Sequence, residues 1–315
     1  METGKRVQIL LSTYNGEKYL REQLDSYLAM EDFDQCAVLI RDDGSTDHTC
    51  EILSEYAERE KFQIVYGENL GWIGSYQWLI QHSDPMCRYF AFSDQDDIWL
   101  PDKMKKALAL LDNCPPGQMA LFASRSCVTD ENLKPLGESI APVRGVSYYN
   151  AMVQNVLPGH TQVFNCVLRD SIVQYGFAQA VGVDWWIYLL GSALGTVAFE
   201  PSCTVLHRQH GNNTVGYQLG FWGSLRKKLR YIRQGKGNSI SFQIQSFYLF
   251  YYEQMPEEYR QETERYLEGL KSLPARLRYL TSCRVYRQEW QDDWKFRLLY
   301  LLGKYNLPCP KEHGV

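Results

Sequence analysis

Four short apolar runs in the first hundred residues alternate with stretches whose apolar side chains recur at helical spacing, and this alternation constrains the fold most. The apolar runs, each an expected β-strand, are Val7–Leu11, Val38–Ile40, Ile64–Tyr66 and Tyr89–Phe92. The stretches that follow them, each an expected helix, are Glu17–Leu28, Thr46–Arg59, Ser75–Gln81 and Asp102–Leu111. This order predicts an α/β fold of Rossmann-like type, with a mainly parallel sheet flanked by helices.

Composition excludes several classes of protein. The 315 residues carry a net charge of −4, whereas a general nucleic-acid-binding protein is usually basic. No stretch approaches the roughly 18 apolar residues of a membrane span, and the first apolar run is too short for a signal peptide. Nine cysteines without a CxxC pair indicate reduced thiols, so we expect a cytoplasmic protein.

The second half of the chain changes character near residue 217. Three further strand-like runs precede that point: Met119–Ala123, Gln162–Asn165 and Thr196–Phe199. Beyond it the chain is rich in Tyr, Arg and Leu, so we expect one domain over 1–216 and a helical extension over 217–315. The basic stretch 222–233 suits an anionic inner membrane leaflet, although a solvated helix face is an equal alternative, and the extension could also form a homodimer.

Polar motifs follow three of the expected strands at the point where each strand ends. They are Ser12–Asn15, Asp42–Ser45 and Asp94–Asp97, and the carboxyl ends of parallel strands meet at one edge of a sheet. Asp94, Asp96 and Asp97 would raise one another's pKa unless a cation lay between them. Such a cluster suits Mg²⁺ or Mn²⁺ bound together with substrate phosphates, and the plain alternative is a solvated loop. A GxGxxG motif and a phosphate-binding P-loop are both absent from the sequence.

The motifs together resemble a known family. The segments LLSTYNGEKYLREQLDS, IRDDGSTDHT, ENLG and FSDQDDIWLPDKM are similar to glycosyltransferase family 2, whose members have the glycosyltransferase-A fold. DQDDIW, together with VDWWIYLLGSALG and HRQHGNN, more narrowly resembles the bacterial rhamnosyltransferases of that family. The resemblance covers about residues 5–216. It implies an inverting glycosyltransferase that needs a divalent metal.

The resemblance also implies roles for residues on the donor side. The segment that cradles the base and ribose of a nucleotide sugar matches Thr13, Tyr14 and Asn15, and Asn69 matches a loop near the donor. Asp42 and Asp43 match an acidic pair, one of which accepts a hydrogen bond from the base, although Asp-Gly-Ser is also ordinary turn chemistry.

Metal and phosphate contacts follow from the same resemblance. Asp94 matches the carboxylate that faces the ribose, and Asp96 matches the carboxylate that binds Mg²⁺ or Mn²⁺. His210 matches a position on the metal or the diphosphate better than His207 does. The remaining expected contacts, to the sugar or the phosphates, are Asp97 and Arg208.

An inverting transfer needs a general base, and Asp184 matches the base position of the family. The usual acidic pair is reduced to one acid because Val183 precedes it, and an alternative role for Asp184 is to cap the helix that follows. Trp185 or Trp186 could stack on the acceptor sugar or be buried, and Thr161 lies in an expected acceptor-side loop.

The leading hypothesis is a cytoplasmic enzyme, peripheral to the inner face of the membrane, that transfers L-rhamnose from dTDP-L-rhamnose. The acceptor would be a cell-surface polysaccharide or its lipid-linked precursor. An alternative donor is UDP-glucose or UDP-galactose. A sugar nucleotidyltransferase is disfavoured because Ser12–Gly16 is not a basic, glycine-rich loop, and the intact acidic motifs argue against a non-catalytic carbohydrate-binding protein.

Overall fold

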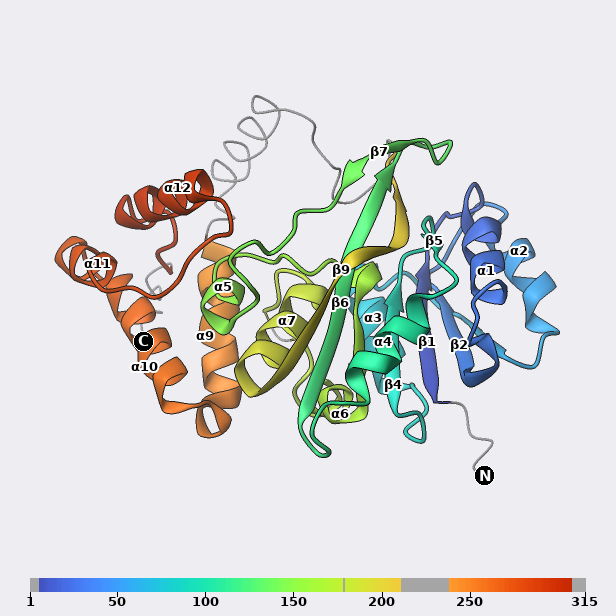
Figure 1. Ribbon diagram of the computed structural model, residues 1–315, viewed down its shortest axis with the longest axis horizontal. Helices are drawn as coiled ribbons and strands as arrows, with labels where there is room; N and C mark the ends of the chain where they lie inside the picture. The colour runs from blue at the N-terminus through green and yellow to red at the C-terminus, as the bar shows by residue number, and fades with distance from the viewer. Residues whose placement is uncertain (1–5, 178, 211–237, 308–315) are drawn as a thin grey trace, which may run out of the picture. The chain divides into compact units, whose positions relative to one another are not determined.

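The computed structural model describes residues 6–177, 179–210 and 238–307, and Figure 1 shows its elements. The strands are β1 (Val7–Thr13), β2 (Cys36–Asp42), β3 (Phe62–Tyr66), β4 (Tyr89–Ser93), β5 (Ile98–Trp99), β6 (Met119–Thr129), β7 (Pro135–Glu138), β8 (Val163–Asn165) and β9 (Gly195–Arg208). The α-helices are α1 (Leu20–Leu28), α2 (Thr49–Ala57), α3 (Gly71–Gln81), α4 (Lys103–Leu111), α5 (Tyr148–Ala151), α6 (Cys166–Tyr175), α7 (Val183–Leu194), α9 (Asn238–Tyr251), α10 (Glu257–Gly269), α11 (Leu273–Leu280) and α12 (Trp290–Leu301). Short 3₁₀ helices are η1 (Phe33–Gln35), η2 (Gly159–Thr161) and η3 (Tyr252–Gln254).

The chain forms two compact units. Within the described residues, the first unit contains 6–141, 156–177 and 182–210, and the second contains 142–155, 179–181 and 238–307. The domain boundary expected at residue 217 and the basic stretch 222–233 lie outside the described residues. Both therefore stay predictions.

The first unit is built on one mixed sheet of nine strands. Its order is β3-β2-β1-β4-β8-β6-β9-β5, with β7 paired to β6. The four strands expected in the first hundred residues pair in parallel, as predicted, and β6 also runs parallel to β9. Pairs that involve β5, β7 and β8 are antiparallel.

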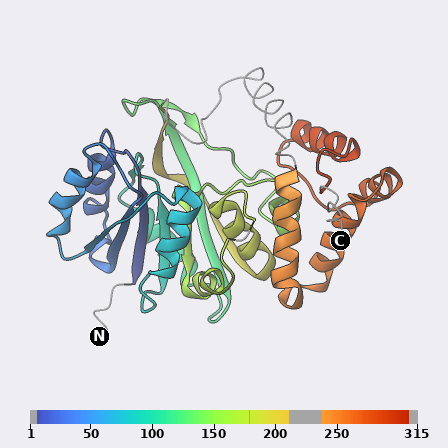
Figure 2. The ribbon, with the colours of Figure 1, turned by 180° about the vertical axis from the view of Figure 1, so that it is seen from behind.

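Alternate residues of the parallel strands are buried on opposite faces of the sheet. Ile9 and its odd-numbered neighbours on β1 join a core with side chains of α1, α2 and α4. On the other face Phe92 packs against Tyr76 of α3, with ring centroids 4.7 Å apart. Figure 2 shows α3 from this second side. Burial on both faces explains why the strands are nearly continuous apolar runs.

Strand register brings distant segments to one edge. Thr13 is opposite Asp42 in the β1–β2 pair, and Ser93 is opposite Leu11 in the β1–β4 pair, so the residues after these strands are neighbours. The short strand β5 pairs with the far end of β9, where Ile98 is opposite Leu206. This pairing places the acidic loop beside the histidines that follow Leu206.

The second unit is helical, and buried tyrosines form its core. The rings of Tyr266, Tyr279 and Tyr300 pack together with centroids 5.1–5.8 Å apart. Each buried hydroxyl has a polar partner: the Tyr300 hydroxyl donates to the Tyr266 carbonyl at 2.6 Å, and the Tyr266 hydroxyl lies 3.0 Å from Ser241 Oγ. Part of the high tyrosine content therefore serves packing in this unit.

Candidate functional site

Asp42 fixes the loops that follow β1 and β2. Thr13 Oγ1 donates to Asp42 Oδ1 at 2.9 Å, and Ser45 donates to the same carboxylate from its hydroxyl at 2.6 Å and from its backbone N–H at 2.9 Å. Asp42 is almost completely buried. These contacts give Asp42 a structural role in shaping the edge of the sheet.

The loop after β1 is held from both sides. Gln95 clamps the backbone of Tyr14, because its Oε1 accepts from Tyr14 N at 2.9 Å and its Nε2 donates to the Tyr14 carbonyl at 3.0 Å. Asn15 adopts a positive φ of 48°, which Asn tolerates, and its Oδ1 accepts from Thr46 N at 2.8 Å. Gly16 permits the clamp, since a Cβ there would lie 2.4 Å from Gln95 Oε1. Gln95 was not singled out from the sequence, although its place between Asp94 and Asp96 was a signal.

Asp43 is buried in an ion pair with Arg41. The guanidinium of Arg41 and the backbone N–H of Leu70, at 2.8 Å, both donate to Asp43 Oδ1. Arg41 also donates to the Glu68 carbonyl at 2.7 Å, so it joins the end of β2 to the loop before α3. In that loop Asn69 is exposed, and its Oδ1 accepts from Gly71 N at 3.0 Å.

The acidic loop after β4 holds three carboxylates in different surroundings. Asp94 is the most exposed of them, Asp96 is largely buried and Asp97 is completely buried. Burial, together with the charges of Asp97 and Asp94, raises the pKa of Asp96 to about 8. Burial alone would also raise the pKa of Asp97, but the charges of His160 and His207 and the hydrogen bonds from His207 and Arg208 lower it.

Asp97 ties the end of β9 to the acidic loop. Its Oδ1 lies 2.8 Å from His207 Nδ1 and accepts from Arg208 N at 3.1 Å. Burial acts to lower the pKa of His207, but the neighbouring carboxylates outweigh it and raise that pKa to about 9. His160 stacks on the His207 ring with centroids 4.4 Å apart, and the ligand-type atoms of Asp97, His160 and His207 lie within 4.8 Å of one another. A protonated His207 therefore compensates the most buried carboxylate.

Lys103 supplies a second buried cation that the sequence did not reveal. Its side chain is completely buried, its Nζ donates to the His160 carbonyl at 2.9 Å, and it lies 4.3 Å from the centroid of the Trp99 ring. Burial lowers the pKa of Lys103 to about 7, although the charges of Asp97 and Asp94 oppose that shift.

His210 faces Asp96 across 2.8 Å, measured from Nε2 to Oδ2. Burial and the cations Lys18 and Arg208 lower the pKa of His210, which favours its neutral form. A neutral imidazole and a carboxylate are suitable ligands for Mn²⁺. Burial and the charges of Asp97 and Asp94 raise the pKa of Asp96, and a bound cation would offset both effects. The residues present therefore fit a divalent cation at Asp96 and His210.

Arg208 is engaged by the protein itself. Its guanidinium donates to the Asp96 carbonyl at 3.1 Å, the Glu131 carbonyl at 2.7 Å and Glu22 Oε2 at 2.7 Å, and it lies over the Tyr19 ring. Arg208 is almost completely buried. This geometry favours a role in joining three segments over the phosphate contact expected from the sequence.

Asp184 lies in the first turn of α7, and Gly182 precedes the helix as its N-cap residue. The carboxylate accepts hydrogen bonds from Gly159 N to Oδ2 at 3.2 Å and from Trp185 N to Oδ1 at 2.8 Å. A Cβ at Gly182 would lie 2.7 Å from Asp184 Oδ1, so this backbone approaches the carboxylate as only glycine allows. Asp184 remains partly exposed.

The expected acceptor contacts divide into buried and accessible residues. Trp186 is completely buried, and so is Thr161, whose hydroxyl donates to the Pro158 carbonyl at 2.8 Å. Trp185 is partly exposed. Trp72 of α3 was not singled out from the sequence, yet it is 45% exposed and its ring would lie 3.5 Å from a Cβ at Gly182. Trp72 is therefore an accessible aromatic side chain beside Asp184.

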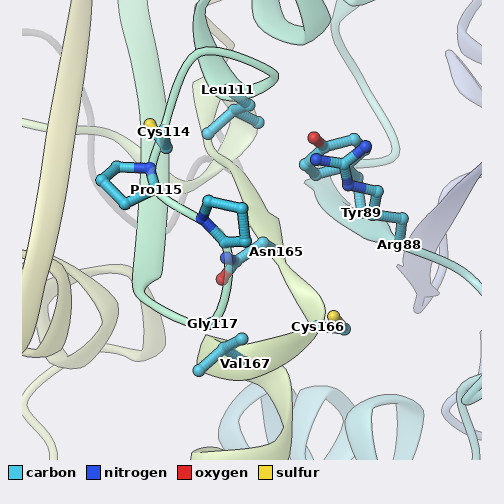
Figure 3. A pocket seen from close by; sticks show the side chains of 10 residues that line it. Arg88, Tyr89, Leu111, Cys114, Pro115, Gly117, Asn165, Cys166 and Val167 are labelled. Atoms are coloured by element: carbon cyan, nitrogen blue, oxygen red, sulfur yellow. The ribbon is translucent and has the colours of Figure 1, made fainter.

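A separate hollow of about 250 Å³ lies at the opposite end of β4, beside Tyr89 (Figure 3). Arg88, Cys114, Pro115 and Asn165 are among its lining residues. It contains none of the residues expected in the site. Among the described residues, no helix combines the length and the apolar character needed to cross a membrane.

Comparisons with known proteins show which family and fold this chain shares. The family described as Glycosyl transferase family 2 matches residues 8–174. The dTDP-rhamnosyl transferase RfbG of Shigella flexneri is 27% identical over an alignment of 250 residues that covers 71% of this chain and 78% of that protein. A glycosyltransferase of Haemophilus influenzae is 25% identical over an alignment of 224 residues that covers 68% of each chain.

Two solved structures share the fold. S. aureus TarS 1–349 in complex with UDP-GlcNAc has a TM-score of 0.56 at 15% identity, over 95% of this chain and 89% of that one. The mannosyltransferase PcManGT of Pyrobaculum calidifontis, in complex with GDP-Man and Mn²⁺, has a TM-score of 0.53 at 17% identity, over 95% and 85%. The glycosyltransferase-A-like fold expected from the sequence is thereby confirmed, helical C-terminal part included. The family match spans more than half of the chain, and the protein belongs to glycosyltransferase family 2.

Proposed function

We propose that this glycosyltransferase moves L-rhamnose from dTDP-L-rhamnose, with inversion at the anomeric carbon, to a cell-surface polysaccharide or its lipid-linked precursor. The DQDDIW motif and the relative RfbG, a dTDP-rhamnosyl transferase, support the choice of donor. TarS with UDP-GlcNAc and PcManGT with GDP-Man have the same fold, so the fold itself does not select the nucleotide.

One observation carries the proposal: η2 joins the acidic loop to the proposed base. His160 Nδ1 lies 3.5 Å from Asp94 Oδ2, and the preceding Gly159 N–H donates to Asp184 Oδ2 at 3.2 Å. The donor-side carboxylates and Asp184 therefore sit on either side of one short turn, as a transfer between donor and acceptor requires.

The donor would bind along the edge of the sheet. Tyr14 and Asn15 are exposed after the end of β1, where the base and ribose would bind. The buried Thr13 would support this segment through its hydrogen bond to Asp42. Both hydrogen bonds described above for Asp43 end on Oδ1, so we assign Oδ2 as the acceptor for the imide N–H of thymine. Asp94 is assigned to the ribose.

Mg²⁺ or Mn²⁺ held by Asp96 and His210 would neutralise negative charge on the donor diphosphate. The chain itself holds this pair in place, because Asp97 accepts from Arg208 N and so fixes the segment that leads to His210. The pairing of β5 with β9 adds the backbone support for that arrangement.

Asp184 would act as the general base. One carboxylate oxygen takes the proton from the acceptor hydroxyl, whose oxygen forms the new bond to the anomeric carbon. The bond from that carbon to the diphosphate breaks on the opposite face, and its electron pair leaves with the diphosphate. Trp72 and Trp185 are the accessible rings on which an acceptor sugar could stack.

The cysteine thiols support a cytoplasmic setting for this reaction. None of the eight cysteines in the described part of the chain forms a disulfide. Reduced thiols are typical of proteins in a reducing compartment.

A donor-binding panel tests the proposal. Calorimetry would compare dTDP-rhamnose, dTDP-glucose, UDP-glucose, UDP-galactose and GDP-mannose, each with Mn²⁺ and then with a chelator. We expect the tightest binding for dTDP-rhamnose, and only with metal. Preference for UDP-glucose or UDP-galactose would replace the donor and keep the reaction. Failure of every donor to bind would contradict the proposal.

A further inference from the structure

Helix α12 of the second unit is apolar on two nearly opposite sides. Phe296 and Tyr300 face inward and are buried, as expected for a helix that packs on a core. Four large apolar residues at intervals of four are instead exposed: Trp290 (68%), Trp294 (68%), Leu298 (56%) and Leu302 (60%). Residues four apart lie above one another on a helix. They therefore form one continuous strip, the α12 stripe, along the helix that Figure 1 labels α12.

The α12 stripe is more than the ordinary exposure of apolar atoms. Single apolar residues are common on protein surfaces, whereas contiguous patches usually mark an interaction site. Two exposed tryptophans in one strip are particularly informative, because the indole ring has an apolar body and a polar N–H. Tryptophan is accordingly enriched at the boundary between lipid chains and headgroups.

The charged residues near the α12 stripe indicate which kind of partner it fits. Residues 270–307 contain eight basic and three acidic side chains, a net charge of +5, while the whole chain carries −4. At helical spacing, Lys295 and Arg297 border the α12 stripe on its two sides. Both are paired within the protein, with Asp292 at 3.2 Å and Asp293 at 3.0 Å. Exposed cations of the same segment include Arg278 and Lys304. An apolar strip with flanking cations complements an anionic lipid surface.

We propose that the α12 stripe docks this enzyme on an anionic membrane surface. The helix would lie in the plane of the membrane, with the indole rings and leucines between the headgroups and the upper acyl chains. The exposed cations Arg278, in α11, and Lys304, just after α12, would face lipid phosphates. A second copy of the chain fits less well, because two copies of the basic segment 270–307 would repel each other. The proposal concerns attachment and does not depend on the donor sugar.

Vesicle flotation of the full chain tests the proposal. Vesicles of phosphatidylcholine with 30% phosphatidylglycerol would be compared with vesicles of phosphatidylcholine alone. We expect binding to the anionic vesicles, weakened at 1 M NaCl because salt screens the cations. The double variant Trp290→Ser/Trp294→Ser should bind at least about tenfold more weakly, since it loses the burial of two large apolar side chains. A matched control is Leu249→Ser, which removes an exposed leucine from α9.

Several outcomes would overturn the proposal. Unchanged vesicle binding by the double variant, with its melting temperature preserved, would remove the α12 stripe from the contact. Loss of binding only when Arg226, Lys227 and Lys228 become Gln would move the contact to that basic segment. A change from dimer to monomer in sedimentation equilibrium, without loss of vesicle binding, would assign the α12 stripe to a second copy. Donor binding by the double variant should equal that of the wild type.

Discussion

Two groups of carboxylates lie at the same edge of the sheet, and the chain compensates them differently. The pair after β2 is surrounded by fixed donors: Arg41 and Leu70 N serve Asp43, and Thr13 and Ser45 serve Asp42. The group after β4 keeps an excess of negative charge, which raises the pKa of Asp96 to about 8 through burial and the charges of Asp97 and Asp94. The first group is complete as folded, whereas the second suits an added cation.

The largest loss of stability is expected in the group after β2, where Arg41 compensates the charge of Asp43. Arg41→Met would leave the buried Asp43 without its cation and should lower the free energy of unfolding by about 3–5 kcal/mol. Urea denaturation measures the change. The control Arg21→Met breaks an exposed pair with Glu55 and should have little effect. Equal losses of unfolding free energy in Arg41→Met and Arg21→Met would contradict the claim that Arg41 compensates a buried charge.

Removing a carboxylate should have opposite consequences in the two groups. In chelator at pH 8, Asp96→Asn should be at least as stable as the wild type, because the folded chain holds the Asp96 proton up to about pH 8 and the unfolded chain only to about pH 4. Ionising Asp96 therefore costs stability as the pH rises through that range. Asp43→Asn should be destabilised.

Mn²⁺ should affect the stability of these two variants differently. At a concentration of Mn²⁺ near 100 times its dissociation constant, the wild type should gain about 2.7 kcal/mol of stability. Asp43→Asn should keep that gain, and Asp96→Asn should lose it. Thermal unfolding with and without Mn²⁺ measures both; a full gain in Asp96→Asn would exclude Asp96 as a ligand.

Lys103 predicts a pH dependence within the second group. Burial lowers its folded pKa to about 7, whereas an unfolded lysine titrates near 10.4, so the unfolded chain binds more protons between these values. The contribution of Lys103 to stability therefore rises with pH by up to about 1.4 kcal/mol per unit between pH 7 and 10. The free energy of unfolding would be measured against pH, in chelator, for the wild type and for Lys103→Met. Their difference isolates the slope due to Lys103 from the opposite slope due to His207. Parallel curves would contradict a buried lysine with a lowered pKa.

A smaller effect, on kcat, is expected from a displacement of Asp184, which belongs to neither group. Gly182→Ala would place a Cβ 2.7 Å from Asp184 Oδ1 and should displace the carboxylate. We expect kcat to fall about tenfold, with donor affinity unchanged, because the change acts on the geometry of proton transfer. Steady-state kinetics and donor calorimetry separate the two. Unchanged kcat would show that the position of this carboxylate is not critical.

The sequence predicted those features of the fold that depend on residues close together in the chain. Polar residues directly after apolar runs mark strand ends, so Asp43 and Asp96 could be expected at one edge before the sheet was seen. Helix starts were less accurate: α3 begins at Gly71, earlier than Ser75, because Gly71 with φ of +71° turns the chain into the helix.

The remaining features depend on contacts between distant segments. Lys103 lies in the helix expected over Asp102–Leu111, and only η2, some 57 residues away, makes it a buried donor. Adjacent tryptophans give no sign of which one is buried, since that depends on how α7 packs on the sheet. Trp72 likewise became a candidate only when Gly182 was found beside it.

The central claim is that Asp184 is the general base, and Asp184→Asn tests it most directly. Single-turnover transfer would be measured with the donor and acceptor that support wild-type turnover, beside donor calorimetry and the exposed control Asp170→Asn in α6. We predict that transfer falls at least about a hundredfold while donor affinity is preserved, because only proton removal is lost. Transfer by Asp184→Asn at the wild-type rate would contradict the account.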